Sequence, residues 1–95
     1  AGAVARHYGA MGYGAGRVRQ ELIRRGVPRE LWDEALAQLP PAGEAIRRFL
    51  DAKLRGRAMT PEESRRLAAA LQRRGFSWND IRPALNERGQ EIDDT

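Results

Sequence analysis

The sequence contains no cysteine and a single histidine, His7. Without cysteine, the chain can form neither disulfides nor thiolate metal sites, and it has no thiol nucleophile. No cluster of histidine and carboxylate residues has the spacing of metal ligands, and the serines have no evident general base beside them in the sequence. We therefore expect a protein that is not an enzyme, with no catalytic residue, no bound metal and no cofactor.

Long apolar segments are also absent. No apolar run approaches the roughly 20 residues that a membrane-spanning helix needs, and the apolar opening of the chain is too short for the core of a signal peptide. We expect a cytoplasmic monomer that does not contact membranes. The sequence does not begin with methionine, so we expect it to be a fragment or a processed product.

The chain is rich in one kind of charge. Its net charge is +4, and sixteen of its seventeen basic residues are arginines, with Lys53 as the exception. Residues 86–95 carry a local charge of −3, which leaves +7 on residues 1–85. The planar guanidinium group suits phosphate and carboxylate partners. A bias in genomic base composition is the alternative explanation for so many arginines.

Two segments of the chain are nearly the same. Residues 17–36 align without a gap on residues 66–85, at a spacing of 49 residues. The identical pairs are Arg17/Arg66, Leu22/Leu71, Arg24/Arg73, Arg25/Arg74, Gly26/Gly75, Ala35/Ala84 and Leu36/Leu85. Similarity at a fixed period is typical of repeat proteins, whose units stack on their neighbours. We therefore look for function on the surface that this stacking creates.

The first repeat reads as three helices. A short helix over residues 2–11 is followed by a glycine-rich connector at 12–16, which we expect to be flexible. The second helix covers residues 17–25, and Gly26 is placed to take the left-handed conformation beyond its end. Pro28 is expected in the first turn of the third helix, where its missing N–H costs nothing. The expected core stripe of that helix is Trp32, Ala35, Leu36 and Leu39.

The second repeat follows the same plan. A long helix is expected over residues 42–55, and residues 60–63 have the pattern of a capping box with proline at the first helical position. Gly75 closes the next helix and Ser77 caps the last one. Pro83 falls inside that last helix and should bend or shorten it. The expected core residues are Ile46, Phe49, Leu50, Leu54, Leu67, Leu71, Ile81, Ala84 and Leu85.

These patterns predict an all-α fold of tandem three-helix repeats that form an elongated helical module. The predicted repeats cover residues 1–39 and 42–89, and residues 90–95 form an acidic, frayed tail. The glycine turn before each third helix resembles a DNA-binding helix-turn-helix. In the first repeat, however, that third helix carries acidic residues at 30, 33 and 34, which phosphates would repel. Recognition of specific base sequences is therefore disfavoured.

The basic residues concentrate on the second helix of each repeat. On a helical wheel Arg17 and Arg24 lie almost on one line, and their counterparts lie on the matching line of the next repeat. The residues predicted to bind a partner or DNA are Arg17, Arg24, Arg25, Arg66, Arg73 and Arg74. The alternative is that they are solvated, with Arg24 and Arg73 paired to nearby carboxylates such as Glu21.

Two motifs resemble a known family. Gly12-Tyr13-Gly14, followed by residues 17–22 and by Arg25-Gly26-Val27, resembles the second repeat of the bacterial regulatory protein family RecX, and residues 73–82 resemble its third repeat. The resemblance covers nearly the whole chain. It implies a protein that binds RecA or the RecA–ssDNA filament and inhibits its ATP hydrolysis and strand exchange, as part of recombination, DNA repair and the SOS response. Single- or double-stranded DNA is a further expected partner.

The chain departs from the family pattern in two ways. The family generally has three such repeats, so we expect a first repeat to be missing from this chain. Pro83 stands where the family more often has a helix-compatible residue. A basic, helix-turn-helix-like nucleic-acid-binding domain that does not depend on RecA is the main alternative function, and a structural scaffold without a DNA role is another.

Overall fold

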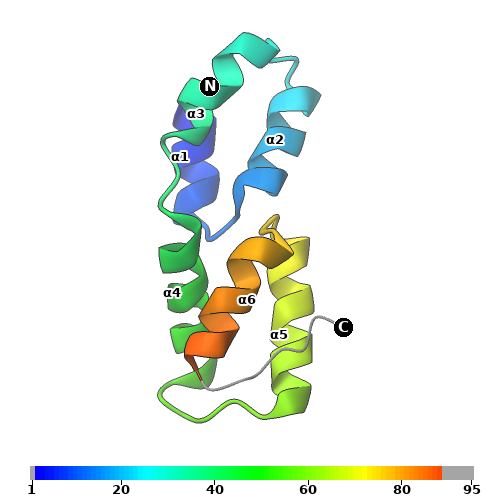
Figure 1. The fold of residues 1–95 in the computed structure, drawn as a ribbon. Helices are drawn as coiled ribbons and strands as arrows, with labels where there is room; N and C mark the ends of the chain where they lie inside the picture. The colour runs from blue at the N-terminus through cyan, green and yellow to red at the C-terminus, as the bar shows by residue number, and fades with distance from the viewer. Residues whose placement is uncertain (1, 89–95) are drawn as a thin grey trace.

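The computed structural model describes residues 2–88, which form an elongated stack of helices (Figure 1). The elements are α1 Gly2–Ala10, α2 Ala15–Arg24, the 3₁₀ turn η1 Arg29–Leu31, α3 Trp32–Leu36, α4 Ala42–Leu54, α5 Pro61–Arg73 and α6 Trp78–Glu87. The described part of the chain contains no strand and extends 42 × 30 × 17 Å. These findings confirm the predicted all-α, elongated fold. The predicted acidic tail at 90–95 lies outside the described residues, and the repeat boundaries at 39 and 42 stay a prediction.

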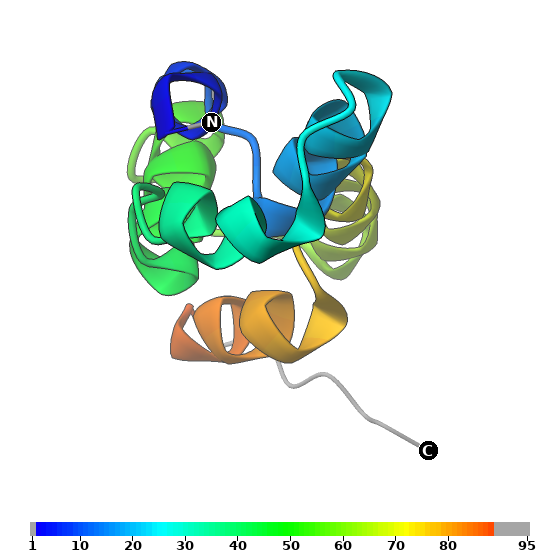
Figure 2. The same ribbon diagram turned by 90° about the horizontal axis from the view of Figure 1, so that it is seen from above.

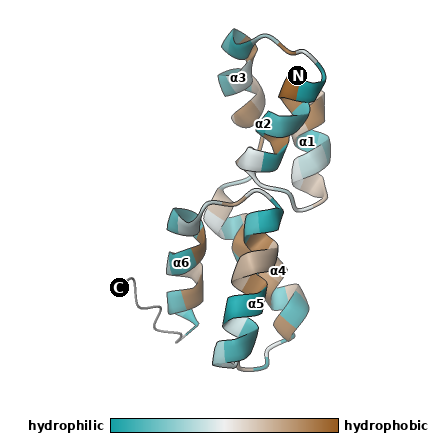
Figure 3. Ribbon diagram, turned by 90° about the vertical axis from the view of Figure 1, so that its right-hand side faces the viewer, coloured by the Kyte–Doolittle hydropathy of each residue, from teal (hydrophilic) through white to brown (hydrophobic). Residues whose placement is uncertain are grey.

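Each group of three helices encloses its own hydrophobic cluster. The smaller cluster joins α1, α2 and α3, and the larger one joins α4, α5 and α6. Val18 and Leu22, four residues apart on α2, are both fully buried, because that spacing puts them on one face of the helix. Figure 3 shows the resulting alternation of hydrophilic and hydrophobic residues along the helices.

Two aromatic residues lie nearer the surface than the sequence predicted. Trp32 and Phe49 were expected in the core, yet both are only partly buried against their clusters. The indole N–H of Trp32 donates a hydrogen bond of 3.0 Å to the carbonyl oxygen of Val27, which holds the ring at the edge of the bundle. The predicted buried residues Ile46, Leu50 and the other aliphatic members of the larger cluster are confirmed.

The predicted helix ends are mostly confirmed. Gly26 and Gly75 have φ angles of 70° and 97°, in the left-handed region that favours glycine. The hydroxyl of Thr60 accepts a hydrogen bond from the backbone N–H of Glu63, whose carboxylate accepts one from the N–H of Thr60. Ser77 likewise caps α6. These side chains satisfy backbone groups that a helix end leaves unpaired.

One expectation about proline was wrong, and the other is narrowed. Pro83 was expected to bend or shorten the last helix; it does not shorten the helix, because α6 continues past it to Glu87, and the bend stays a prediction. Pro28 does not lie in the first turn of the third helix but precedes the 3₁₀ turn, and only five residues then form α3. The third helical segment of the first repeat is therefore shorter than its counterpart α6.

The two groups of helices meet where α2 lies above α5 (Figures 1 and 2). The N-terminus of α2 rests on the C-terminal end of α5: the N–H of Gly14 donates to the carbonyl oxygen of Arg74 at 2.8 Å, and the N–H of Gly16 donates to that of Gly75 at 2.9 Å. A Cβ atom added at Gly14 would lie 2.8 Å from the oxygen of Gly75. Gly14 and Gly16 of the connector are therefore needed for close packing between the repeats, and the flexibility of the connector stays a prediction.

Candidate partner-binding interface

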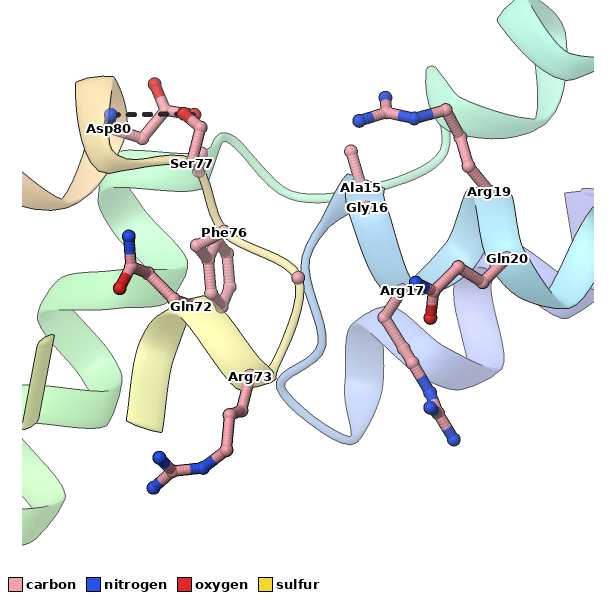
Figure 4. Close-up of a pocket in the computed structure, with 12 residues that line it drawn as sticks. Ala15, Gly16, Arg17, Arg19, Gln20, Gln72, Arg73, Phe76, Ser77 and Asp80 are labelled. Atoms are coloured by element: carbon pink, nitrogen blue, oxygen red, sulfur yellow. Dashed lines mark hydrogen bonds between the residues drawn. The ribbon is translucent and has the colours of Figure 1, made fainter. Parts of the chain in front are cut away.

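The contact between α2 and α5 leaves a groove of about 470 Å³, the junction groove. Its charged lining residues are Arg17, Arg19, Arg73 and Asp80. In Figure 4 the side chains of Arg17 and Arg73 point to the same side of the junction, and that of Arg19 points to the other. The junction thus brings together two of the predicted residues, one from each repeat, and adds Arg19, which the sequence reasoning had not selected.

The arginines of the junction groove have no carboxylate partner in the part of the chain that the structure describes. Among residues 2–88 no ion pair involves Arg17, Arg19 or Arg73. The one carboxylate in the groove, on Asp80, accepts a hydrogen bond of 3.0 Å from the hydroxyl of Ser77. The groove therefore has an excess of positive charge on side chains that are free to meet an anionic group.

Tyr13 positions one of these arginines. The guanidinium carbon of Arg17 lies 5.5 Å from the centre of the Tyr13 ring, within the range of a cation–π interaction. The guanidinium of Arg74 lies at the same distance from this ring. The sequence did offer a signal for this role, because Tyr13 stands between the glycines that bring the repeats together.

Four of the exposed arginines of α2 and α5 form a row across the junction. Along the stack the order is Arg66, Arg73, Arg17 and Arg24, because α2 begins where α5 ends. Within each helix the two arginines are seven residues apart, which places them on nearly the same side and about 10 Å apart along the axis. We call these four residues the arginine row.

At the far end of the row, Glu21 binds two arginines. Its carboxylate accepts hydrogen bonds from Nε of Arg24 at 3.2 Å and from Nε of Arg25 at 2.9 Å. Glu21 is only 5% exposed. These hydrogen bonds lower the pKa of the Glu21 carboxyl from 4.5 to about 2, against the opposing effect of its burial. The alternative of local pairing therefore holds for Arg24, whereas Arg73 forms no ion pair among the described residues.

We expect this cluster to give the protein an acid-dependent stability. A carboxyl with a lowered pKa in the folded state stabilises the fold fully above its unfolded pKa, and the contribution is lost as the pH falls toward the folded pKa. The stability should therefore decline from about pH 4.5 to about pH 2. In Glu21→Gln this decline should be shallower. Chemical denaturation at several pH values measures it, and an unchanged slope in the variant would contradict the assignment.

Glu63 provides a matched comparison for that experiment. The hydrogen bond from Arg57, followed by the one from the N–H of Thr60, lowers the pKa of the Glu63 carboxyl to about 2 as well. Glu63→Gln should therefore remove a similar share of the pH dependence, although it lies in the other repeat. The double variant should show the flattest profile of the three.

Arg74 has a different role from the other predicted residues. It donates a hydrogen bond of 3.2 Å to the carbonyl oxygen of Met11, and its guanidinium lies 5.1 Å from the ring centre of Phe49. Because Met11 belongs to the first repeat and Phe49 to α4, Arg74 links the two repeats. Of the six predicted arginines, Arg17, Arg66 and Arg73 are thus the ones exposed without an ion pair in the described structure. Their binding to a partner stays a prediction.

Among residues 2–88 there is no group of three or more histidine, aspartate or glutamate side chains that could hold a metal ion. In the same part of the chain, none of the helices combines the length and the apolar character needed to cross a membrane.

Comparison with known proteins identifies relatives of both repeats. The family model for the second three-helix domain of RecX matches residues 1–36, and that for the third three-helix domain of RecX matches residues 43–85. A regulatory protein RecX from Trichlorobacter lovleyi is 39% identical over 72 residues, which cover 70% of this chain and 47% of the relative. The chain therefore spans about half the length of this relative. No solved structure matches it.

Proposed function

The chain belongs to the RecX family, and from this premise we propose that it binds RecA, or the filament that RecA forms on single-stranded DNA, and inhibits ATP hydrolysis and strand exchange. Its role would be to modulate homologous recombination and DNA repair in the cytoplasm as a monomer without catalytic activity. The observation that carries the proposal is the arginine row, which crosses both repeats on a molecule 42 Å long.

The chemistry of the row supports an elongated anionic partner. Arg66, Arg73 and Arg17 are exposed and have no carboxylate partner among the described residues. Guanidinium groups bind both phosphates and carboxylates in a bidentate manner, so the row suits the DNA of a filament as well as acidic side chains of RecA. A regulator that acts by occupying a filament needs such a surface and no catalytic group.

The test is a titration of this chain into RecA during ATP turnover that depends on single-stranded DNA, at moderate salt. Inhibition at substoichiometric amounts is expected, because one molecule that bridges protomers affects more than one of them. No inhibition in excess of RecA would contradict the proposal that these two repeats regulate the filament.

Direct binding of nucleic acid without RecA is the second candidate function. The junction groove favours it, because three arginines line the groove and its only carboxylate is hydrogen-bonded to Ser77. In that case affinity for bare DNA would be high and would fall steeply with salt, and RecA would not increase it. Titrations of labelled single- and double-stranded DNA at two salt concentrations, with and without RecA, separate the two functions.

A further inference from the structure

A second groove lies between α4 and α5, and we propose that it binds an acidic peptide segment that carries a large apolar side chain. This α4–α5 groove has a volume of about 350 Å³. Its floor is formed by Phe49, Leu54, Leu67 and Ala70, and its rim by Lys53, Arg57, Glu63, Arg66 and Arg74. The two grooves share no lining residue, although Arg66 of the arginine row stands on the rim of the α4–α5 groove.

The groove exists because α4 and α5 are held together mainly by α6. In the first repeat, the backbones of α1 and α2 approach each other closely, whereas the backbones of α4 and α5 each approach α6 more closely than one another. Figure 2 shows α6 in one layer and the α4 and α5 pair in another. The side of this pair that is not covered by α6 therefore stays open, and no residue of α6 lines the groove.

The floor of the groove is apolar and reachable from solvent. Leu54 and Leu67 are buried beneath it, while Phe49 and Ala70 are only partly buried and line its surface. The small side chain of Ala70 keeps the groove open, because a larger side chain at this position would fill it. Covering such a floor with an apolar side chain removes both surfaces from water, which is favourable in proportion to the area buried.

The rim of the groove is positively charged. Of its five charged residues only Glu63 is acidic, and that carboxylate is paired with Arg57 at 2.8 Å. Lys53 lies 5.6 Å from the ring centre of Phe49, so a cation stands directly at the edge of the apolar floor. A ligand that matches both the basic rim and the apolar floor needs carboxylates on either side of an apolar group.

This combination favours a peptide over nucleic acid. A phosphodiester backbone would pair with the rim, but it has no apolar group to place on the floor, and a stacking base would find only one aromatic ring there, that of Phe49. Acidic peptides with one bulky apolar residue match both parts, with the apolar side chain supplying affinity and the carboxylates supplying orientation. Binding of such a peptide to the α4–α5 groove does not require RecA to be the partner of the arginine row, and a synthetic peptide can test it.

The test uses a fluorescently labelled peptide of about ten residues, with aspartate and glutamate on both sides of a central phenylalanine, titrated with the full 95-residue chain. Lys53→Glu should weaken binding by about tenfold or more. Arg55→Glu is the matched control: it lies at the same end of α4, changes the net charge equally and does not line the groove. Equal losses in the two variants would overturn the proposal.

Two further measurements test the apolar part. A peptide with serine in place of phenylalanine should bind about tenfold more weakly, since its contact with the floor is lost. Ala70→Trp should abolish binding of the phenylalanine peptide by filling the groove, and circular dichroism verifies that this variant folds. Equal affinity for both peptides would overturn the inference. Displacement of the peptide by single-stranded oligonucleotide as readily as by unlabelled peptide would do so too, and would assign the groove to nucleic acid.

Discussion

Gly75→Ala is expected to lower the free energy of unfolding by at least about 3 kcal/mol, whereas Gly26→Ala should lower it by only about 1 kcal/mol. These glycines are equivalent positions of the repeat, and both have positive φ angles, 97° and 70°. Both substitutions therefore force a side chain into the left-handed region, which costs alanine about 1 kcal/mol. That part of the effect is common to the two variants.

The difference between them comes from the junction. A Cβ at Gly75 would lie 2.3 Å from the backbone nitrogen of Arg17 and 2.8 Å from its Cβ, and neither atom can move away without shifting α2. A Cβ at Gly26 would have no atom within 4 Å in the described structure. If the repeats moved apart to relieve the overlap, the hydrogen bonds of Gly14 and Gly16 across the junction would be lost instead.

Thermal unfolding followed by circular dichroism measures both variants. One kcal/mol corresponds to a shift of about 4 to 8 °C in the midpoint for a chain of this size, so the two substitutions should be clearly separated. Similar midpoints would show that the close contact of Gly75 with Arg17 does not exist in solution. The comparison requires no partner, and its outcome is independent of the proposed function.

The double charge reversal Arg17→Glu/Arg73→Glu is expected to weaken inhibition of the RecA filament by at least about tenfold. Both side chains are exposed, lie on the same side of the junction and lack a carboxylate partner in residues 2–88. Replacing them puts two negative charges at the centre of the arginine row, where an anionic partner would be repelled. Folding should be retained, because neither side chain is buried in a hydrophobic cluster.

The matched control is Arg6→Glu/Arg55→Glu, which changes the net charge by the same amount. Arg6 and Arg55 are exposed, form no ion pair in the described structure and lie away from the junction groove. ATP turnover by RecA on single-stranded DNA gives the inhibitory midpoint for each variant. If both double variants lost potency equally, general charge and not the arginine row would be responsible. Binding of bare DNA, measured in parallel, shows whether the row contacts phosphates or RecA.

Local sequence patterns predicted the helices and their ends well. The apolar spacing on α2 and α4, the capping box at Thr60 and the glycines at positive φ depend on residues within four positions of each other. The residues that form such a pattern also make the interactions that shape the helix or its cap, because helix geometry and capping are local. The same reasoning misplaced Pro28, because the choice between a 3₁₀ and an α-helical turn depends on tertiary packing.

The repeat pattern alone could not predict which arginines pair with a carboxylate. Arg24 and Arg73 are equivalent and identical, yet Arg24 pairs with Glu21 while Arg73 has no such partner among residues 2–88. The position equivalent to Glu21 in the second repeat is Ala70. One difference in sequence thus frees Arg73 for the junction groove and opens the floor of the α4–α5 groove. The approach of Gly75 to Arg17 had no local signal at all, because the two residues come from different repeats.

The first backbone N–H groups of α2 and α5 find their hydrogen-bond acceptors in different places. The stack of helices therefore has a direction. α2 has no side-chain cap and takes its hydrogen-bond acceptors from the end of α5, whereas α5 supplies its own cap through Thr60 and Glu63 and begins with a proline that has no N–H to offer. The backbone at Gly26, which is equivalent to Gly75, is open in the described structure, whereas the start of α5 is closed by its own cap. The end-to-end contact therefore has a direction, because the uncapped start of α2 rests on the end of the middle helix of the repeat that follows it.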